Sequence, residues 1–126
     1  MTATLEHANL CVADPHKTAA WMTKVFDWHI RWEGPALSSG YTVHVGSKDS
    51  YLALFSPAEP LAEAPERYST KGALNHLAFV VDDLDQAEAA VVAAGYTPMN
   101  HGDYEPGRRF YFLDEGGVEY ELVQYD

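Results

Sequence analysis

Apolar and polar residues alternate over residues 4–12, as they do in a half-buried β-strand. One face would carry Leu5, His7, Asn9 and Cys11, and the other Ala8, Leu10 and Val12. Asp14 and Pro15 then supply an N-cap and a first helical residue, and apolar pairs four residues apart predict a helix over 15–26. Turn residues separate three further strand candidates, "WHIRWE", "YTVHVG" and "YLALFS".

The second half of the chain repeats this order. A strand over 74–81 is followed by a helix that Asp82 or Asp83 caps and that ends where Gly95 takes the C′ position. The next strand candidates are "YTPMNH", "RRFYFLD" and "VEYELVQY". The pattern predicts an α+β fold of two tandem βαβββ modules within one domain: residues 1–56, a proline-containing linker over 57–72, and residues 73–126.

The repeat has a fixed offset, which makes two histidines equivalent. His7 and His76 differ by 69 positions, and an offset of 68 near the module ends places Ala53 opposite Glu121. If the modules form a curved mixed sheet around a shared cavity, both histidines and Glu121 could face that cavity. Two imidazoles and a carboxylate form a triad that binds Fe(II) and also suits Mn, Zn or Ni, leaving positions open for substrate.

Purely structural roles for these residues are the alternative. A lone strand histidine is more often a satisfied core residue than a ligand, and Glu121 could be an edge charge. The structural interpretation is favoured for the remaining histidines, His16, His29, His44 and His101. The repeat at His7 and His76, together with a carboxylate inside the β-prone "VEYELV", makes the triad about as plausible as that alternative.

Composition limits the partners of the chain. A net charge of −11 opposes binding to nucleic acid or to an anionic membrane, and no apolar run approaches the roughly 20 residues that span a bilayer. Glu6 and His7 stand where a signal peptide would be basic and then apolar, so we expect a cytoplasmic protein. The single Cys11 excludes an internal disulfide.

The segments "EHANLCVAD", "NHLAFVVDD" and "RRFYFLDEGGVEYELV" together resemble the vicinal oxygen chelate superfamily. That group includes glyoxalase I, fosfomycin-resistance enzymes, extradiol dioxygenases and bleomycin-resistance proteins. The closing segment is similar to the family ending F-x-D-P-D-G-x-x-x-E, with Glu115 in place of the proline. The resemblance implies metal ligands at His7, His76 and Glu121. Glyoxalase I has a fourth ligand where this chain has Ala53, so the set is closer to the fosfomycin-resistance and dioxygenase branches.

The resemblance also implies a function. We expect a metal-dependent lyase, transferase or dioxygenase acting on a small oxygenated substrate, with Fe²⁺ or Mn²⁺ favoured and Zn²⁺ or Ni²⁺ possible. The alternative is a metal-independent, bleomycin-resistance-like protein that sequesters a small molecule. Family members of this length form homodimers whose subunits share the sites. Candidate substrate contacts are Tyr104, Arg108 and Arg109, in a loop before the seventh strand, and Tyr111; Trp32, Tyr41 and Phe112 are candidate cavity walls.

Overall fold

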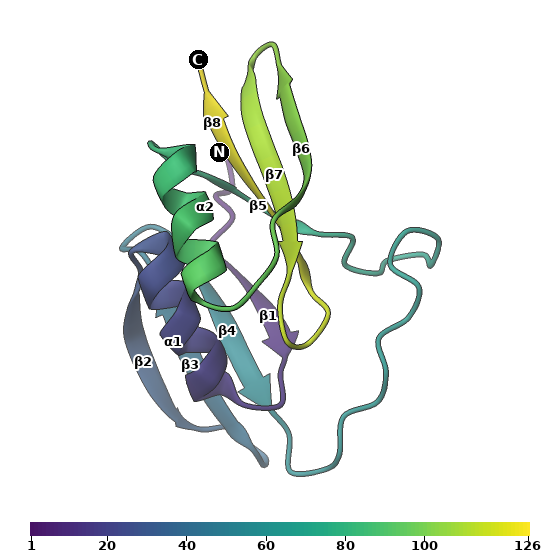
Figure 1. Cartoon of the computed structure of the whole chain (residues 1–126). Helices are drawn as coiled ribbons and strands as arrows, with labels where there is room; N and C mark the ends of the chain where they lie inside the picture. Colours follow the sequence, from purple (N-terminus) through teal and green to yellow (C-terminus); the bar gives the residue numbers. More distant parts are fainter. The chain divides into compact units, whose positions relative to one another are not determined.

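The computed structural model describes residues 1–126, which divide into two compact units, Met1–Ala62 and Glu63–Asp126. Each unit runs β-α-β-β-β and forms one four-stranded mixed sheet with one helix (Figure 1). The predicted α+β fold of two βαβββ modules is therefore confirmed. Neither helix is long and apolar enough to cross a bilayer.

Unit 1 pairs its first strand with its last. Its elements are β1 (His7–Cys11), α1 (Pro15–Phe26), β2 (His29–Pro35), β3 (Tyr41–Gly46) and β4 (Tyr51–Ser56). The strand order is β1-β4-β3-β2, with β1 parallel to β4 and the other neighbours antiparallel. The bounds of α1, β3 and β4 are those that the sequence predicts.

Helix α1 covers one face of the unit 1 sheet. The Asp14 carboxylate accepts the Lys17 N–H at 3.1 Å and so caps the helix, as predicted. Apolar side chains from the helix and the sheet are buried between them: Trp21, Met22, Val25, Val43, Val45, Leu52 and Leu54. Because strand residues alternate in direction, the intervening residues, His7 and His44 among them, occupy the sheet face that α1 does not cover.

Unit 2 repeats this topology with β5-β8-β7-β6 as its strand order. Its elements are β5 (Leu77–Val80), α2 (Leu84–Ala93), β6 (Met99–Tyr104), β7 (Gly107–Leu113) and β8 (Glu119–Tyr125). Asp83, one of the two predicted caps, accepts the Gln86 N–H at 3.0 Å. Gly95 has a φ of +97° directly after the C-cap, so it takes the predicted C′ position, where its missing side chain avoids strain.

Some predicted strands begin later than expected: the strand predicted over 4–12 is β1, His7–Cys11, and the strand predicted over 74–81 is β5, Leu77–Val80, so His76 lies just before its strand. The sequence predicts a strand over 96–101, whereas β6 begins at Met99. The Tyr96 N–H donates to the Val91 carbonyl at the end of α2, and Pro98 has no N–H that could bond to a neighbouring strand. The segment 96–98 is therefore occupied by the helix ending, and the strand extends to Tyr104 instead.

Part of the predicted linker is bound to β8. Arg67 donates from Nη2 to Glu119 Oε1 at 3.1 Å, and the Tyr68 hydroxyl donates to the same oxygen. Glu119 is 4% exposed, so these donors supply the partners that a buried carboxylate requires. Nothing in the proline-containing composition of residues 57–72 indicates this attachment.

Candidate metal and substrate site

A histidine and a buried glutamate meet in unit 2. His76 directly precedes β5, and Glu121 lies in β8 at the ladder position beside Ala78. His76 Nε2 lies 3.0 Å from Glu121 Oε1. The Glu121 side chain is 9% exposed and that of His76 is 32% exposed, so the carboxylate is nearly buried and the imidazole is partly exposed. The structure thus brings together two of the three residues that the sequence predicts as metal ligands.

Arg109 and Tyr111 on β7 complete the surroundings of Glu121. Arg109 donates from Nη1 to Glu121 Oε2 at 2.9 Å, so the carboxylate has a different partner on each oxygen. Tyr111 is paired with Glu121 across the sheet, and its ring meets the His76 ring edge-on, with 5.7 Å between centroids. Burial first, and then the Glu121 charge, raise the pKa of the Tyr111 phenol, so it keeps its proton at neutral pH.

The residue before each repeated histidine fixes the orientation of its imidazole. His76 Nδ1 lies 2.6 Å from Asn75 Oδ1, and in unit 1 His7 Nδ1 lies 2.8 Å from Glu6 Oε1. In each case the neighbouring oxygen can accept a hydrogen bond from the imidazole. An oxygen partner on Nδ1 is also the usual arrangement in histidines that bind a metal through Nε2.

Unit 2 supplies two side chains of the kinds that bind divalent cations. His76 offers an imidazole nitrogen and Glu121 a carboxylate oxygen, and both are ligand types for divalent transition metals. Neither unit alone assembles three His, Cys, Asp or Glu side chains around one point, and His7 belongs to unit 1.

The predicted substrate-contact residues separate into two groups. The Arg109 guanidinium carbon lies 4.9 Å from the Tyr104 ring centroid, which joins Tyr104 to the His76–Glu121 surroundings. Arg108 instead pairs with Asp85 of α2 at 3.1 Å. The predicted loop location of these residues is wrong, because Tyr104 ends β6 and both arginines lie in β7, where alternation sends them to opposite faces.

Ala53 occupies the position in unit 1 that Glu121 occupies in unit 2. Ala53 pairs with Asn9 in the parallel β1–β4 ladder, as Glu121 pairs with Ala78 in the parallel β5–β8 ladder. The equivalence expected from the sequence offset is therefore present in the register. Ala53 is 2% exposed, and its methyl group offers no ligand atom.

A row of rings that the sequence did not predict lies on the uncovered face of the unit 1 sheet. His7, Tyr51, His44 and Trp32 follow one another across β1, β4, β3 and β2, with centroid separations of 4.8, 4.7 and 5.2 Å. Burial first, and then the charges of His7 and Arg31, lower the pKa of His44, which is therefore neutral at neutral pH. The alternation within "YTVHVG" already places His44 opposite the buried valines, which is the signal that could have found it.

Comparisons with known proteins agree on one family. The model of the Glyoxalase/Bleomycin resistance protein/Dioxygenase superfamily matches residues 4–122. A glyoxylase/bleomycin resistance protein/dioxygenase domain from Frankia sp. EAN1pec is 18% identical, with full coverage of both chains and a TM-score of 0.83. The fosfomycin resistance protein FosX from Mesorhizobium loti is 25% identical over 98% of this chain and 92% of that chain, with a TM-score of 0.73.

A second FosX structure was solved with bound ions. FosX from Listeria monocytogenes, complexed with Mn(II) and sulfate, is 21% identical over 100% of this chain and 95% of that chain, with a TM-score of 0.74. Comparison with curated protein sequences finds no significant match.

Proposed function

Because the chain belongs to the Glyoxalase/Bleomycin resistance protein/Dioxygenase superfamily, we propose that it is a metal-dependent enzyme acting on a small oxygenated substrate. The observation that carries the proposal is the His76 Nε2 to Glu121 Oε1 separation of 3.0 Å, with Nδ1 of His76 held by Asn75. The reaction would be that of a lyase, a transferase or a dioxygenase.

His7, His76 and Glu121 would hold the cation, and the Mn(II) in the similar FosX structure supports Mn²⁺ or Fe²⁺, with Zn²⁺ or Ni²⁺ as further candidates. When bound, a divalent cation supplies Lewis-acid polarisation of substrate oxygens. Ala53 leaves one potential ligand position without a protein atom. The chain would therefore provide three ligands and leave room for two substrate oxygens.

The remaining residues would bind and orient the substrate. Arg109 fixes one oxygen of Glu121 and so holds the other toward His76. Tyr111 keeps its phenolic proton and can donate it to a substrate oxygen. Two further residues are proposed as substrate contacts. Tyr104 lies beside Arg109, and Arg108 forms an ion pair with Asp85.

Metal uptake tests the proposal directly. Protein purified without chelator should contain a stoichiometric divalent metal, and metal at 100 times its Kd should add about 2.7 kcal/mol to the free energy of unfolding. His76→Ala should abolish both effects because it removes a ligand, and Glu121→Gln should strongly weaken both because it replaces a carboxylate ligand with a neutral amide. Elemental analysis and thermal unfolding with Fe(II), Mn(II), Zn(II) or Ni(II) measure them.

His101→Ala is the matched control for these variants. His101 Nε2 lies 2.9 Å from Glu88 Oε2, so the control removes an imidazole–carboxylate pair of the same kind outside the proposed site. It should bind metal as the wild type does. Wild-type protein that neither contains nor is stabilised by any of these metals would overturn the metal-dependent function.

A metal-independent protein that sequesters a small molecule is the second candidate. The row of rings on the unit 1 sheet favours it, since aromatic side chains bind apolar ligands without a cation. In that case ligand binding would survive His76→Ala.

The domain organisation, the oligomeric state and the cellular location of the chain are proposed from the sequence and the family. We propose a single domain with modules at 1–56 and 73–126 joined by residues 57–72, and a homodimer whose subunits share the metal sites. A cytoplasmic location remains a prediction from the sequence.

A further inference from the structure

The uncovered face of the unit 1 sheet presents an exposed aromatic ring. Trp32 on β2 is 53% exposed, and its inner neighbour in the row of rings is His44, at a centroid distance of 5.2 Å. A Cβ at Gly34 would lie 2.9 Å from the Trp32 ring. Glycine at that position lets the indole lie against its own strand, and a larger side chain there would displace the ring. Much of the ring surface remains exposed.

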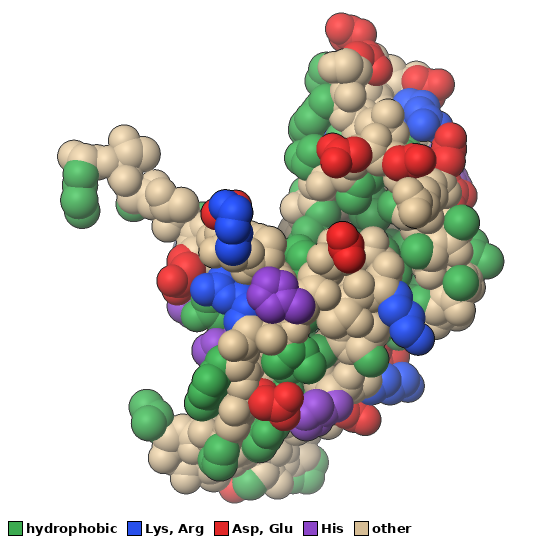
Figure 2. Space-filling view, turned by 90° about the vertical axis from the view of Figure 1, so that its left-hand side faces the viewer, with side chains coloured by type: hydrophobic (Ala, Val, Ile, Leu, Met, Phe, Trp, Pro, Cys, Tyr) green, Lys and Arg blue, Asp and Glu red, His purple; other side chains and the backbone are tan.

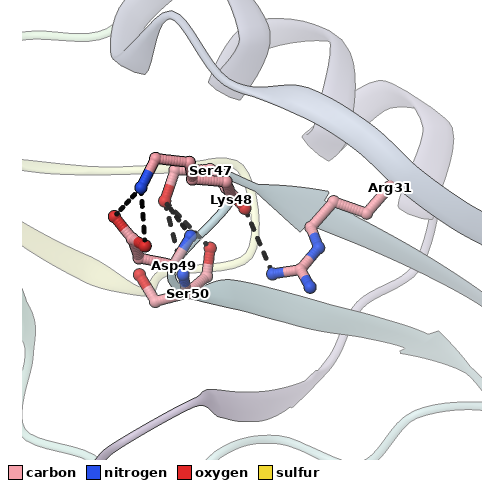
Figure 3. Close-up of polar contacts among 5 residues, drawn as sticks. All are labelled: Arg31, Ser47, Lys48, Asp49 and Ser50. Atoms are coloured by element: carbon pink, nitrogen blue, oxygen red, sulfur yellow. Dashed lines mark hydrogen bonds and ion pairs between the residues drawn. The ribbon is translucent and has the colours of Figure 1, made fainter.

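An arginine of the same strand reaches this face and forms no ion pair, although its charge acts on the carboxylate of Glu6. A register irregularity in β2 between Ile30 and Trp32 inserts Arg31 as an extra residue, so that Arg31 and Trp32 both reach the uncovered face. The guanidinium carbon lies 4.5 Å from the Tyr51 ring centroid. One N–H of Arg31 goes to the Ser47 carbonyl at 3.1 Å (Figure 3).

Arg31 is the one arginine of this acidic chain that forms no ion pair. The other three arginines are each paired with a carboxylate: Arg67 with Glu119, Arg108 with Asp85, and Arg109 with Glu121. Acidic side chains are scattered over the surface drawn in Figure 2, yet none forms an ion pair with Arg31. Nearby Lys48 is already bound to Asp49 at 3.1 Å (Figure 3).

We propose that this face binds a planar aromatic anion, with the ring of the ligand on Trp32 and its carboxylate on Arg31. A flat ring gains contact with the open indole surface, and a guanidinium presents paired N–H donors that match a carboxylate. The assignment rests on the proposed function, since His7 of the same row is a proposed metal ligand, and it names the substrate class of that site as aromatic acids.

Three probes separate the ring from the charge. Isothermal titration calorimetry on the full chain would compare 2-naphthoate, the saturated decahydro-2-naphthoate and the neutral 2-naphthylmethanol. We expect 2-naphthoate to bind about tenfold more tightly than either of the others, because each lacks one interaction worth about that factor. Equal affinity for the saturated acid would overturn the proposal.

Variants locate the binding on this face. Trp32→Leu and Gly34→Ala should each weaken 2-naphthoate binding about tenfold, the first by removing the ring and the second by displacing it. Arg31→Gln should weaken binding of 2-naphthoate but leave 2-naphthylmethanol unchanged. Lys48→Gln, which removes a paired charge near the same turn, is the control and should have no effect. Unchanged affinity in both Trp32→Leu and Gly34→Ala would overturn the proposal.

Metal dependence is tested separately. The same titrations would be run on EDTA-treated protein and on protein with Mn(II). Binding of 2-naphthoate that depends on Trp32, in protein that takes up none of Fe(II), Mn(II), Zn(II) and Ni(II), would overturn the metal-dependent function and support the aromatic site. Mn(II) uptake that depends on His76, without 2-naphthoate binding, would overturn the aromatic site alone.

Discussion

Single residues in this chain acquire their roles from neighbours that lie far away in the sequence. His76 and Glu121 are 45 positions apart and meet because β5 and β8 are parallel neighbours. The sequence repeat could nominate them, since it marks equivalent strand positions. The repeat could not predict that Arg109 binds Glu121 or that Arg31 forms no ion pair. Both facts depend on which side chains reach one another across a sheet.

A pH effect belongs to Glu33, on the helix side of β2. His16 Nε2 lies 2.7 Å from Glu33 Oε1, and the Tyr41 hydroxyl donates to the same oxygen at 2.8 Å. These bonds, that of His16 first, lower the pKa of the Glu33 carboxyl below 4.5. A folded-state pKa below the unfolded one stabilises the fold above pH 4.5, and this contribution is lost as the pH falls through the folded-state pKa.

Glu33→Gln should therefore be less stable than the wild type at pH 6, and the difference should shrink as the pH is lowered toward 3. Urea unfolding at several pH values measures it. Glu59→Gln, a change at an exposed glutamate in the segment after β4, should show no such dependence. A Glu33→Gln difference that grows on acidification would contradict the assignment.

Whole elements follow the sequence closely where local chemistry decides them. The bounds of α1 and the caps Asp14 and Asp83 agree with prediction because a capping carboxylate and an amphipathic stripe act within a few residues. Strand ends agree less well, as the later start of β6 shows, because they depend on partner strands. The attachment of Arg67 and Tyr68 to β8 could not be predicted, since its sequence signal is a single buried carboxylate 51 or more positions away.

The cap of α2 gives an element-scale prediction. Asp83→Ala removes the acceptor of the Gln86 N–H and should lower the free energy of unfolding by about 1 kcal/mol. Asp82→Ala, at the exposed neighbouring aspartate, should change it by less than about 0.5 kcal/mol. Chemical denaturation of the two variants compares them directly, and equal losses would show that charge near the helix start matters and the cap does not.

At the scale of the whole molecule, the proposed assembly requires each metal site to take His7 from one subunit and His76 with Glu121 from the other. His7→Ala and His76→Ala homodimers would then each lack a ligand at both sites. A mixed dimer would have one site missing both histidines and one site with all three ligands. Unfolding and refolding the two variants together should therefore restore metal binding to about a quarter of the wild-type stoichiometry, since about half of the dimers are mixed.

Sites built within a single chain predict a different result, because every chain in the mixture would lack one histidine and no site would be restored. Light scattering should first give about twice the 14.0 kDa chain mass. Elemental analysis of the co-refolded sample then separates the two arrangements, with a mixture of His76→Ala and Glu121→Gln as the control. His76 and Glu121 of each shared site come from the same subunit, so this control mixture should not regain metal binding. Regained metal binding in the control would contradict the proposed sharing between subunits.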